Sequence, residues 1–159
     1  MIFITLGSQK FQFNRLLKAV DSLVENGCIT EKVFAQIGYS DYKPLNYDYK
    51  QFLDRDEFEE TIRIADIVIT HGGTGAIIGA VKKGKKVIAV PRLAEYGEHV
   101  DNHQRQLVGQ FKNMDLIFAC DDCSELEVAI EHTRLSSFKS YESNTAKIIN
   151  SIEKFIQGE

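Results

Sequence analysis

The chain has 159 residues, of which 43% are hydrophobic and 26% charged, and its formal net charge is −4. This length and composition are typical of one well-cored globular domain and exclude disordered and fibrous proteins, so we expect residues 1–159 to form a single domain. The negative charge gives no general electrostatic basis for binding nucleic acid, and it argues against binding to anionic lipid.

The sequence contains no apolar run near the roughly 20 residues that a membrane-spanning helix needs. Its first residues lack a basic region ahead of the apolar segment, which indicates a strand and not a signal peptide. Three cysteines and no signal favour a reducing cytosol. Cys120 and Cys123 form one CxxC pair, but a zinc site would need two further ligands and only His132 lies near in sequence. We expect this pair to be structural, at a strand end.

Short apolar runs alternate with helical periodicity along the whole chain. The boundaries come from turn residues such as Asn26-Gly27 and from a predicted capping box at Ser124 and Glu127. In chain order the pattern predicts a strand over 2–6, a helix over 13–24, a strand over 33–37, a tyrosine-rich loop over 38–49, a helix over 58–65, a strand over 67–70, a helix over 76–82, a strand over 87–90, a helix over 101–111, a strand over 116–119, a helix from 124 to about 134, and a last helix over 144–156.

The predicted strands are continuous apolar runs with little alternation, which is typical of strands covered on both faces. The fold class is therefore α/β, a Rossmann-like parallel sheet sandwiched by helices with right-handed crossovers. Ligands of such sheets bind outside the carboxyl ends of the strands. The unusual residues follow those ends, at 7–9, 71–75 and 92–104.

The segment HGGTG, residues 71–75, joins a strand directly to a helix. A helix N-terminus presents unpaired N–H groups and roughly half a positive charge, and glycines let a phosphate approach the backbone closely. Thr74 can add a hydroxyl. The turn is not a Walker A loop, because no GK[ST] follows, and Ile78 stands where a dinucleotide fingerprint has its third glycine. A tight turn without any ligand explains the glycines about as well.

The segment PRLAEYGEHVDNHQRQ, residues 91–106, is rich in polar side chains. Asp101 and Asn102 could serve only as helix caps, and His71, considered alone, fits a capping or core histidine. His99 and His103 are four residues apart but lack the glutamate of an HExxH motif, so no metal site is predicted.

The motifs THGGTGAIIGAVKKGKKVIAVPR and EHVDNHQ, in this order, resemble the glycosyltransferase family 28 C-terminal domain, the nucleotide-sugar half of a GT-B enzyme. GSQ at 7–9, FAQIGYSDYKP and ADIVITHGG also match, so the likeness covers nearly the whole chain. The resemblance is strongest to C-terminal GT-B halves that exist as separate subunits. These are the catalytic subunit of the two-subunit transferase that adds the second N-acetylglucosamine in dolichol-linked oligosaccharide synthesis, and bacterial PssE- or EpsF-like subunits of exopolysaccharide and capsule synthesis.

The opening residues, 1–23, favour the bacterial type. The resemblance then implies β-1,4-transfer of galactose or glucuronate from a UDP-sugar to a lipid-linked sugar. A UDP-N-acetylglucosamine transferase subunit and a non-catalytic nucleotide-sugar-binding or enhancer module are the alternatives. NAD binding is disfavoured by the imperfect fingerprint and by the lack of an acidic residue at the expected strand end.

The resemblance also implies site residues. The loop at 7–9 and the turn at 72–75 hold the diphosphate from two sides, the loop after Ile37 lies near the base, and the segment 98–104 meets the sugar hydroxyls. Gly79 stands where the family usually has an acidic residue for the ribose, so the nucleotide is bound less tightly, Glu95 substitutes, or activity is lost. The implied nucleotide-sugar site is Gly7, Ser8, Gln9, His71, Gly72, Gly73, Thr74, Gly75, Glu98, Asp101, Asn102 and Gln104.

The implied reaction is inverting transfer, in which an acceptor hydroxyl attacks the anomeric carbon while UDP leaves, with no metal and no other cofactor. A GT-B site lies between two domains and this chain has room for one. A membrane-anchored partner subunit is therefore expected to bring the lipid-linked saccharide acceptor and the general base, with His71 and His99 as base candidates on this chain. The expected location is cytoplasmic, at the inner face of the membrane through that partner.

Overall fold

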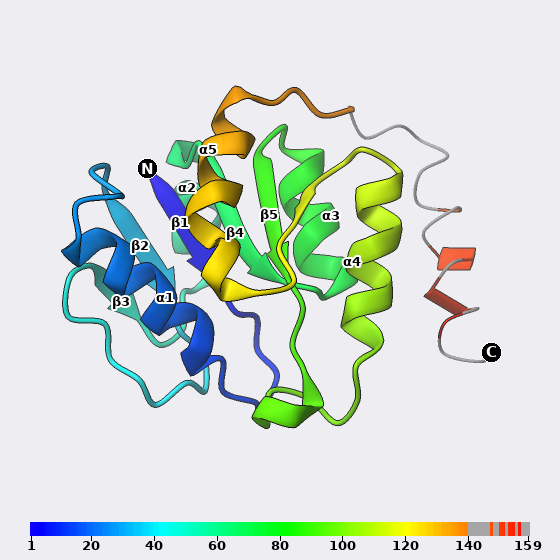
Figure 1. Ribbon diagram of the computed structural model, residues 1–159, viewed down its shortest axis with the longest axis horizontal. Helices are drawn as coiled ribbons and strands as arrows, with labels where there is room; N and C mark the ends of the chain where they lie inside the picture. Colours follow the sequence, from blue (N-terminus) through cyan, green and yellow to red (C-terminus); the bar gives the residue numbers. More distant parts are fainter. Residues whose placement is uncertain (140–146, 148–149, 152, 155, 157–159) are drawn as a thin grey trace.

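The computed structural model describes residues 1–139, 147, 150–151, 153–154 and 156. Within these residues six strands form one sheet in the order β3-β2-β1-β4-β5-β6, and all five pairings are parallel. This confirms the predicted α/β fold with a parallel sheet (Figure 1). The strands are β1 (Ile2–Thr5), β2 (Val33–Gln36), β3 (Asp48–Lys50), β4 (Ile67–His71), β5 (Lys86–Val90) and β6 (Phe118–Ala119).

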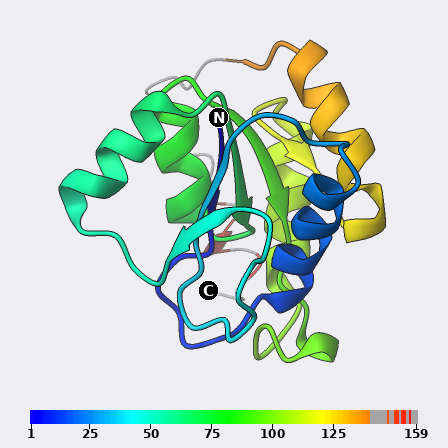
Figure 2. The ribbon, with the colours of Figure 1, turned by 90° about the vertical axis from the view of Figure 1, so that its left-hand side faces the viewer.

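Helices cover both faces of the sheet, as Figures 1 and 2 show from two directions. One face carries α1 (Asn14–Glu25) and α5 (Leu126–Leu135). The other carries α2 (Arg55–Ile64), α3 (Thr74–Lys82) and α4 (His103–Asn113). Two short 3-10 helices, η1 (Ala94–Tyr96) and η2 (Cys123–Glu125), precede α4 and α5.

The sheet separates two apolar cores. In β1, Ile2 and Ile4 pack with α1 and α5, whereas Phe3 between them packs with α2, α3 and α4. β4 divides in the same way, with Ile67 and Ile69 on one side and Val68 on the other. Because successive side chains of a strand point to opposite faces, burial on both faces requires uninterrupted apolar runs. The structure confirms this interpretation of the sequence.

The strand β3 was missed by the sequence analysis, which assigned residues 38–49 to a loop. Asp48, Tyr49 and Lys50 are all exposed, and the strand pairs only with β2, at the edge of the sheet. An exposed edge strand of three residues needs no apolar side chains, so it leaves no hydrophobic signal in the sequence.

Two helix starts also differ from the prediction. α2 begins three residues early because Asp54 and Glu57 form a capping box, in which the Asp54 carboxylate accepts from the Glu57 amide at 2.8 Å. The capping box predicted at Ser124 and Glu127 is wrong. The Asp122 carboxylate instead accepts from the Ser124 amide at 2.9 Å, and η2 precedes α5. The α4 helix begins at His103, not at 101.

The helix predicted over 144–156 lies mostly outside the described residues. Within those that are described, no helix combines the length and the apolar character required to cross a bilayer. Cys120 is a buried free thiol directly after β6, and burial raises its pKa to about 12. Its Sγ donates to the Asp122 carbonyl at 3.2 Å, in agreement with a structural role.

Candidate functional site

Three loops meet beyond the carboxyl ends of β1, β4 and β5, the edge at which parallel sheets bind ligands. Arg92, in the loop after β5, joins this loop to the one after β1 through its buried guanidinium. Its Nη atoms donate to the main-chain carbonyls of Leu6 at 2.6 Å, Phe11 at 3.1 Å and Gln12 at 3.2 Å, all in the segment around the end of β1. These bonds fix the position of the GSQ loop relative to the loop after β5.

Among the residues that the structure describes, no carboxylate forms an ion pair with the buried Arg92 side chain. Only 1% of it is exposed, and its guanidinium lies 5.1 Å from the centre of the Phe13 ring. Burial lowers the pKa of Arg92 to about 10, while nearby Glu98 acts in the opposite direction. The guanidinium therefore stays protonated at neutral pH and places a positive charge beneath the GSQ loop. Sequence reasoning gave Arg92 no role, although a charged residue directly after a buried strand and a proline could have signalled one.

The imidazole of His71 lies between Gly7 and Gly73. A Cβ atom at Gly7 would lie 2.7 Å from His71 Nε2, and one at Gly73 would lie 2.2 Å from His71 Cε1. Gly7 also has a φ of 72°, a conformation that residues with side chains rarely adopt. The two glycines are therefore required for packing around the imidazole, whatever ligand binds nearby.

His71 is poorly suited to be a general base. Burial, with the positive charge of Arg92, lowers the pKa of His71 to about 3, so the ring is neutral at physiological pH. Its Nδ1 accepts from the Gly73 amide at 3.1 Å, so in a neutral ring the proton lies on Nε2. We assign His71 a positioning role in the turn between β4 and α3.

The amides of the glycine turn divide into two groups. Gly72 donates to Gln104 Oε1 at 3.0 Å and Gly73 to His71 Nδ1, so neither is free for a phosphate. The first amides of α3, at residues 74–76, are those that a helix leaves without partners in its own backbone. Gly75 is exposed, and a Cβ atom placed there would have no neighbour within 4 Å in the described part of the chain. The amides that remain for an anion are thus those of residues 74–76, whereas the sequence analysis expected the whole 72–75 segment to take part.

The Thr74 hydroxyl, expected to assist a phosphate, is at the start of this helix. Its Oγ1 is buried and has no hydrogen-bond partner among the described residues. It lies in the same first turn as the exposed Gly75.

Gln104 and Glu98 are occupied within the protein and do not present free groups to a sugar. Gln104 Oε1 accepts from the amides of Gly72 and Arg92, both at 3.0 Å. The Glu98 carboxylate receives two bonds of 3.0 Å from Arg15 and accepts from the Leu93 amide at 3.0 Å. Glu98 is 0% and Gln104 1% exposed. These two members of the expected site hold the loop after β5 in place, and the sequence alone could not distinguish that task from ligand binding.

The remaining expected residues are accessible. Ser8 and Gln9 are exposed in the loop after β1, and Asp101 and Asn102 are exposed before α4. Asn102 Oδ1 accepts from the Ala94 amide at 2.8 Å, so part of its side chain is engaged. Asp101 is 57% exposed at its side chain.

The loop after β2, expected near the base, lies against the GSQ loop at residues 7–9. Gly38 has a φ of 58°, and a Cβ atom there would lie 3.0 Å from the Gly7 carbonyl oxygen. The next residue, Tyr39, is 45% exposed and packs edge to face on Phe52, with ring centres 5.3 Å apart. The exposed aromatic pair of Tyr39 and Phe52 therefore lies beside the loops at the carboxyl ends of the strands.

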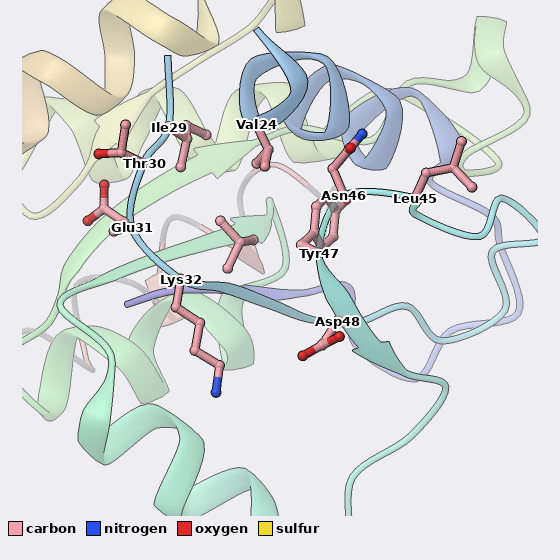
Figure 3. Close-up of a pocket in the computed structure, with 10 residues that line it drawn as sticks. Val24, Ile29, Thr30, Glu31, Lys32, Leu45, Asn46, Tyr47 and Asp48 are labelled. Atoms are coloured by element: carbon pink, nitrogen blue, oxygen red, sulfur yellow. The ribbon is translucent and has the colours of Figure 1, made fainter. Parts of the chain in front are cut away.

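A hollow of about 500 Å³ lies away from these loops, between the end of α1 and the segments leading into β2 and β3 (Figure 3). Its polar side chains include Lys32 and Asp48, and Glu31 on its border pairs with Arg134. It opens at the amino ends of the strands, where parallel sheets do not usually bind ligands. We therefore assign the functional site to the carboxyl edge.

Comparison with known families decides the classification. The sequence profile of the glycosyltransferase family 28 C-terminal domain matches residues 1–158. The chain belongs to this family. Human UDP-N-acetylglucosamine transferase subunit ALG13 is 29% identical over 126 residues, which cover 75% of this chain and 11% of the human protein. The ALG13 subunit of Candida glabrata is 39% identical over 57 residues, covering 36% of this chain and 27% of the yeast protein. The chain thus spans well under half the length of these relatives.

Solved structures show the same fold. The NMR solution structure of ALG13 superposes with a TM-score of 0.61 at 16% identity, covering 98% of this chain and 94% of that one. The glycotransferase of kitacinnamycin also gives a TM-score of 0.61, at 15% identity, over 99% of this chain and 39% of the enzyme. The family 28 domain described here has the architecture of the C-terminal half of a GT-B glycosyltransferase.

Proposed function

We propose that this protein is the UDP-sugar-binding subunit of a two-component inverting glycosyltransferase. The observation that carries the proposal is the convergence of an exposed helix N-terminus, the GSQ loop and the loop after β5 at one edge of a family 28 sheet. Oriented amides at residues 74–76 and the buried charge of Arg92 both favour a diphosphate there.

In this proposal the protein stabilises the leaving group. As the bond to the anomeric carbon breaks, negative charge grows on the UDP diphosphate. Dipoles fixed before the reaction stabilise such charge without reorganisation. The first turn of α3 supplies amides from one side and the loop containing Ser8 supplies a hydroxyl from the other. No metal is needed for this step.

For the donor, UDP-N-acetylglucosamine is the first choice to test, because the ALG13 relatives are UDP-N-acetylglucosamine transferase subunits. They support this donor better than the galactose or glucuronate expected from the sequence, and transfer in exopolysaccharide or capsule synthesis stays a prediction. Asp101 and Asn102 are the accessible side chains that we assign to the sugar hydroxyls.

The general base is assigned to a partner subunit. His71 is buried, and its Nδ1 is occupied. His99 is more accessible but faces Asp101 and stacks on Phe11. A membrane-anchored acceptor-binding subunit would supply the base and the lipid-linked saccharide.

The test is reconstitution of the complex. Purified protein is incubated with UDP-N-acetylglucosamine and a lipid-linked saccharide acceptor, with and without membranes that contain the partner. We expect weak donor binding and little turnover alone, and turnover when the partner is present. Full transfer by the single chain would contradict the two-component proposal, and a failure to bind any UDP-sugar would contradict the donor site.

A non-catalytic nucleotide-sugar-binding module is the second candidate, and Gly79 favours it. This position lacks the acidic side chain that the family resemblance leads us to expect for the ribose, and no neighbour among residues 1–139 fills the space beside it. Such a module would bind UDP in the reconstituted complex without any gain in turnover.

A further inference from the structure

Three side chains that commonly bind metals lie together in the segment that leads into α4. His99 Nδ1 and His103 Nδ1 lie 3.3 Å and 2.5 Å from the same oxygen, Asp101 Oδ1. Ligand atoms of all three residues lie within 4.8 Å of one another. Nitrogen and oxygen ligands on a tetrahedral zinc ion are about 3.3 Å apart, given their usual distances from the metal. The three groups therefore need only small movements to share one cation.

The sequence predicts no metal because His99 and His103, four residues apart, lack the glutamate of a helical HExxH motif. In the structure α4 begins at His103, so His99 belongs to the preceding loop and the chain turns between the two. The turn brings the centres of the two imidazole rings to 4.8 Å from each other. Asp101 lies between the two histidines in the sequence. A loop can thus gather three ligands from five consecutive residues where a helix would separate them.

The surroundings hold His99 in a form suited to a metal. Its ring stacks on Phe11, with centres 5.4 Å apart and planes inclined by 28°, and its side chain is 8% exposed. Burial and neighbouring His103 lower the pKa of His99, which favours the neutral imidazole that metals require. Its Nδ1 accepts a long bond of 3.4 Å from the Asp101 amide, which a metal ion bound at this nitrogen would replace.

We infer that His99, Asp101 and His103 form a binding site for a divalent transition cation, with Zn²⁺ as the principal ion. Two imidazoles and one carboxylate suit zinc and its neighbours in the first transition row, whereas Mg²⁺ and Ca²⁺ require mainly oxygen ligands. Three protein ligands leave a coordination position for water, and Asp101 is exposed enough to admit the ion.

Occupation of this site has a consequence that rests on the proposed function. Asp101 is one of the side chains assigned to the donor sugar, and a carboxylate that ligates zinc is fixed in position and loses much of its negative charge to the ion, which weakens its bond to a sugar hydroxyl. Zinc should therefore weaken binding of the UDP-sugar more than binding of UDP, whose diphosphate is assigned to the first turn of α3.

Metal binding is tested by titrating the untagged protein with Co²⁺ under reducing conditions, recording its visible absorption, and then displacing it with Zn²⁺. The free thiols Cys28, Cys120 and Cys123 are competing ligands, but cobalt thiolates add an intense near-ultraviolet band that histidine and carboxylate ligands lack. We expect one equivalent of Co²⁺ per chain and no thiolate band.

Variants separate this site from other histidines. His103→Gln and His99→Gln should each weaken Co²⁺ binding at least tenfold, whereas His132→Gln, at an exposed position on α5, should leave it unchanged. His103 is partly exposed, so its variant should keep the thermal midpoint of the wild type. Absence of binding at millimolar Co²⁺, a thiolate spectrum, or equal affinity in both loop variants and the wild type would overturn the inference.

Competition between Zn²⁺ and the UDP-sugar is measured as a separate part of the test. Zn²⁺ should raise the Kd of the UDP-sugar in the wild type and not in His103→Gln. If the protein binds cobalt through the three residues but binds no UDP-sugar, the metal site stands and the proposed function fails. If it binds UDP-sugar but no metal, the metal site fails and the proposed donor site stands.

Discussion

The guanidinium of Arg92 donates to the main-chain carbonyl of Leu6 at 2.6 Å, across 86 positions of sequence. This bond joins the loop after β5 to the end of β1, and further bonds from Arg92 reach Phe11 and Gln12. The loop assigned to the diphosphate and the loop assigned to the donor sugar are thus held together by one buried side chain. Loss of this side chain should affect the stability and the site together.

Arg92→Met should lower the free energy of unfolding by about 3 kcal/mol or more, since each buried polar group left unpaired costs roughly 1–3 kcal/mol. Urea denaturation measures the change. Arg105→Met, on the exposed side of α4, is the matched control and should stay within about 0.5 kcal/mol of the wild type. Equal effects of the two substitutions would show that the bonds from Arg92 contribute little.

The glycines of the turn should respond in opposite ways. Gly73→Ala places a Cβ atom 2.2 Å from His71 Cε1 and should destabilise the fold by about 1–3 kcal/mol. Gly75→Ala meets no neighbour and should keep the wild-type stability, or gain up to about 1 kcal/mol from helix propensity. It should nevertheless weaken UDP binding, because its methyl group occupies the open approach to the helix amides. Thermal melts and UDP titrations of both variants check this pair, and unchanged UDP affinity in Gly75→Ala would count against the anion site.

The buried His71 should make stability depend on pH. Its pKa is lowered from 6.5 to about 3 in the folded state, so below pH 6.5 the unfolded chain binds a proton that the folded chain does not. Stability should therefore fall as pH falls from 6.5 towards 3, with a contribution of up to about 1.4 kcal/mol per pH unit from this group. His71→Asn, whose side-chain oxygen can accept from the Gly73 amide, removes the titrating group. Urea denaturation at several pH values should show a shallower decline for the variant, and parallel curves would refute a buried neutral histidine.

An acidic side chain at Gly79 should restore the missing ribose contact. Gly79 lies one turn after Gly75 on the same face of α3, and the space beside it is open. Gly79→Glu should bind UDP several times more tightly, with a gain in stability of at most about 1 kcal/mol. Gly109→Glu, at a similarly open position in α4, should give the stability gain without the gain in affinity. Calorimetric titration with UDP separates the two, and an identical Kd in the two variants would remove the ribose role of this position.

Much of the fold could be predicted because burial on both faces of the sheet requires apolar residues at consecutive positions of each strand. Ile2 to Ile4 and Ile67 to Ile69 must be apolar throughout, since alternate side chains serve the two cores. The edge strand Asp48–Lys50 could not be predicted in this way, because its side chains are exposed and need not be apolar.

The sequence could predict where the candidate site lies in the fold, but it could not predict the contacts of the individual side chains. The carboxyl edge and the glycine turn follow from strand order and residue type. Whether a polar group faces a ligand or the protein depends on contacts distant in sequence, such as Arg15 with Glu98 and Gly72 with Gln104. Motif spacing carries no information about these partners. It therefore assigned Glu98 and Gln104 to the sugar, although the structure buries both.

The most direct test of the account is an NMR titration of the isotopically labelled protein with UDP. We predict saturable shifts that are largest at the amides of residues 74–76 and at Ser8, with small shifts for Gly72 and Gly73, whose amides are already bonded within the protein. Absence of saturable shifts at millimolar UDP, or shifts centred on the hollow beside Val24 and Tyr47, would contradict a diphosphate site at the first turn of α3.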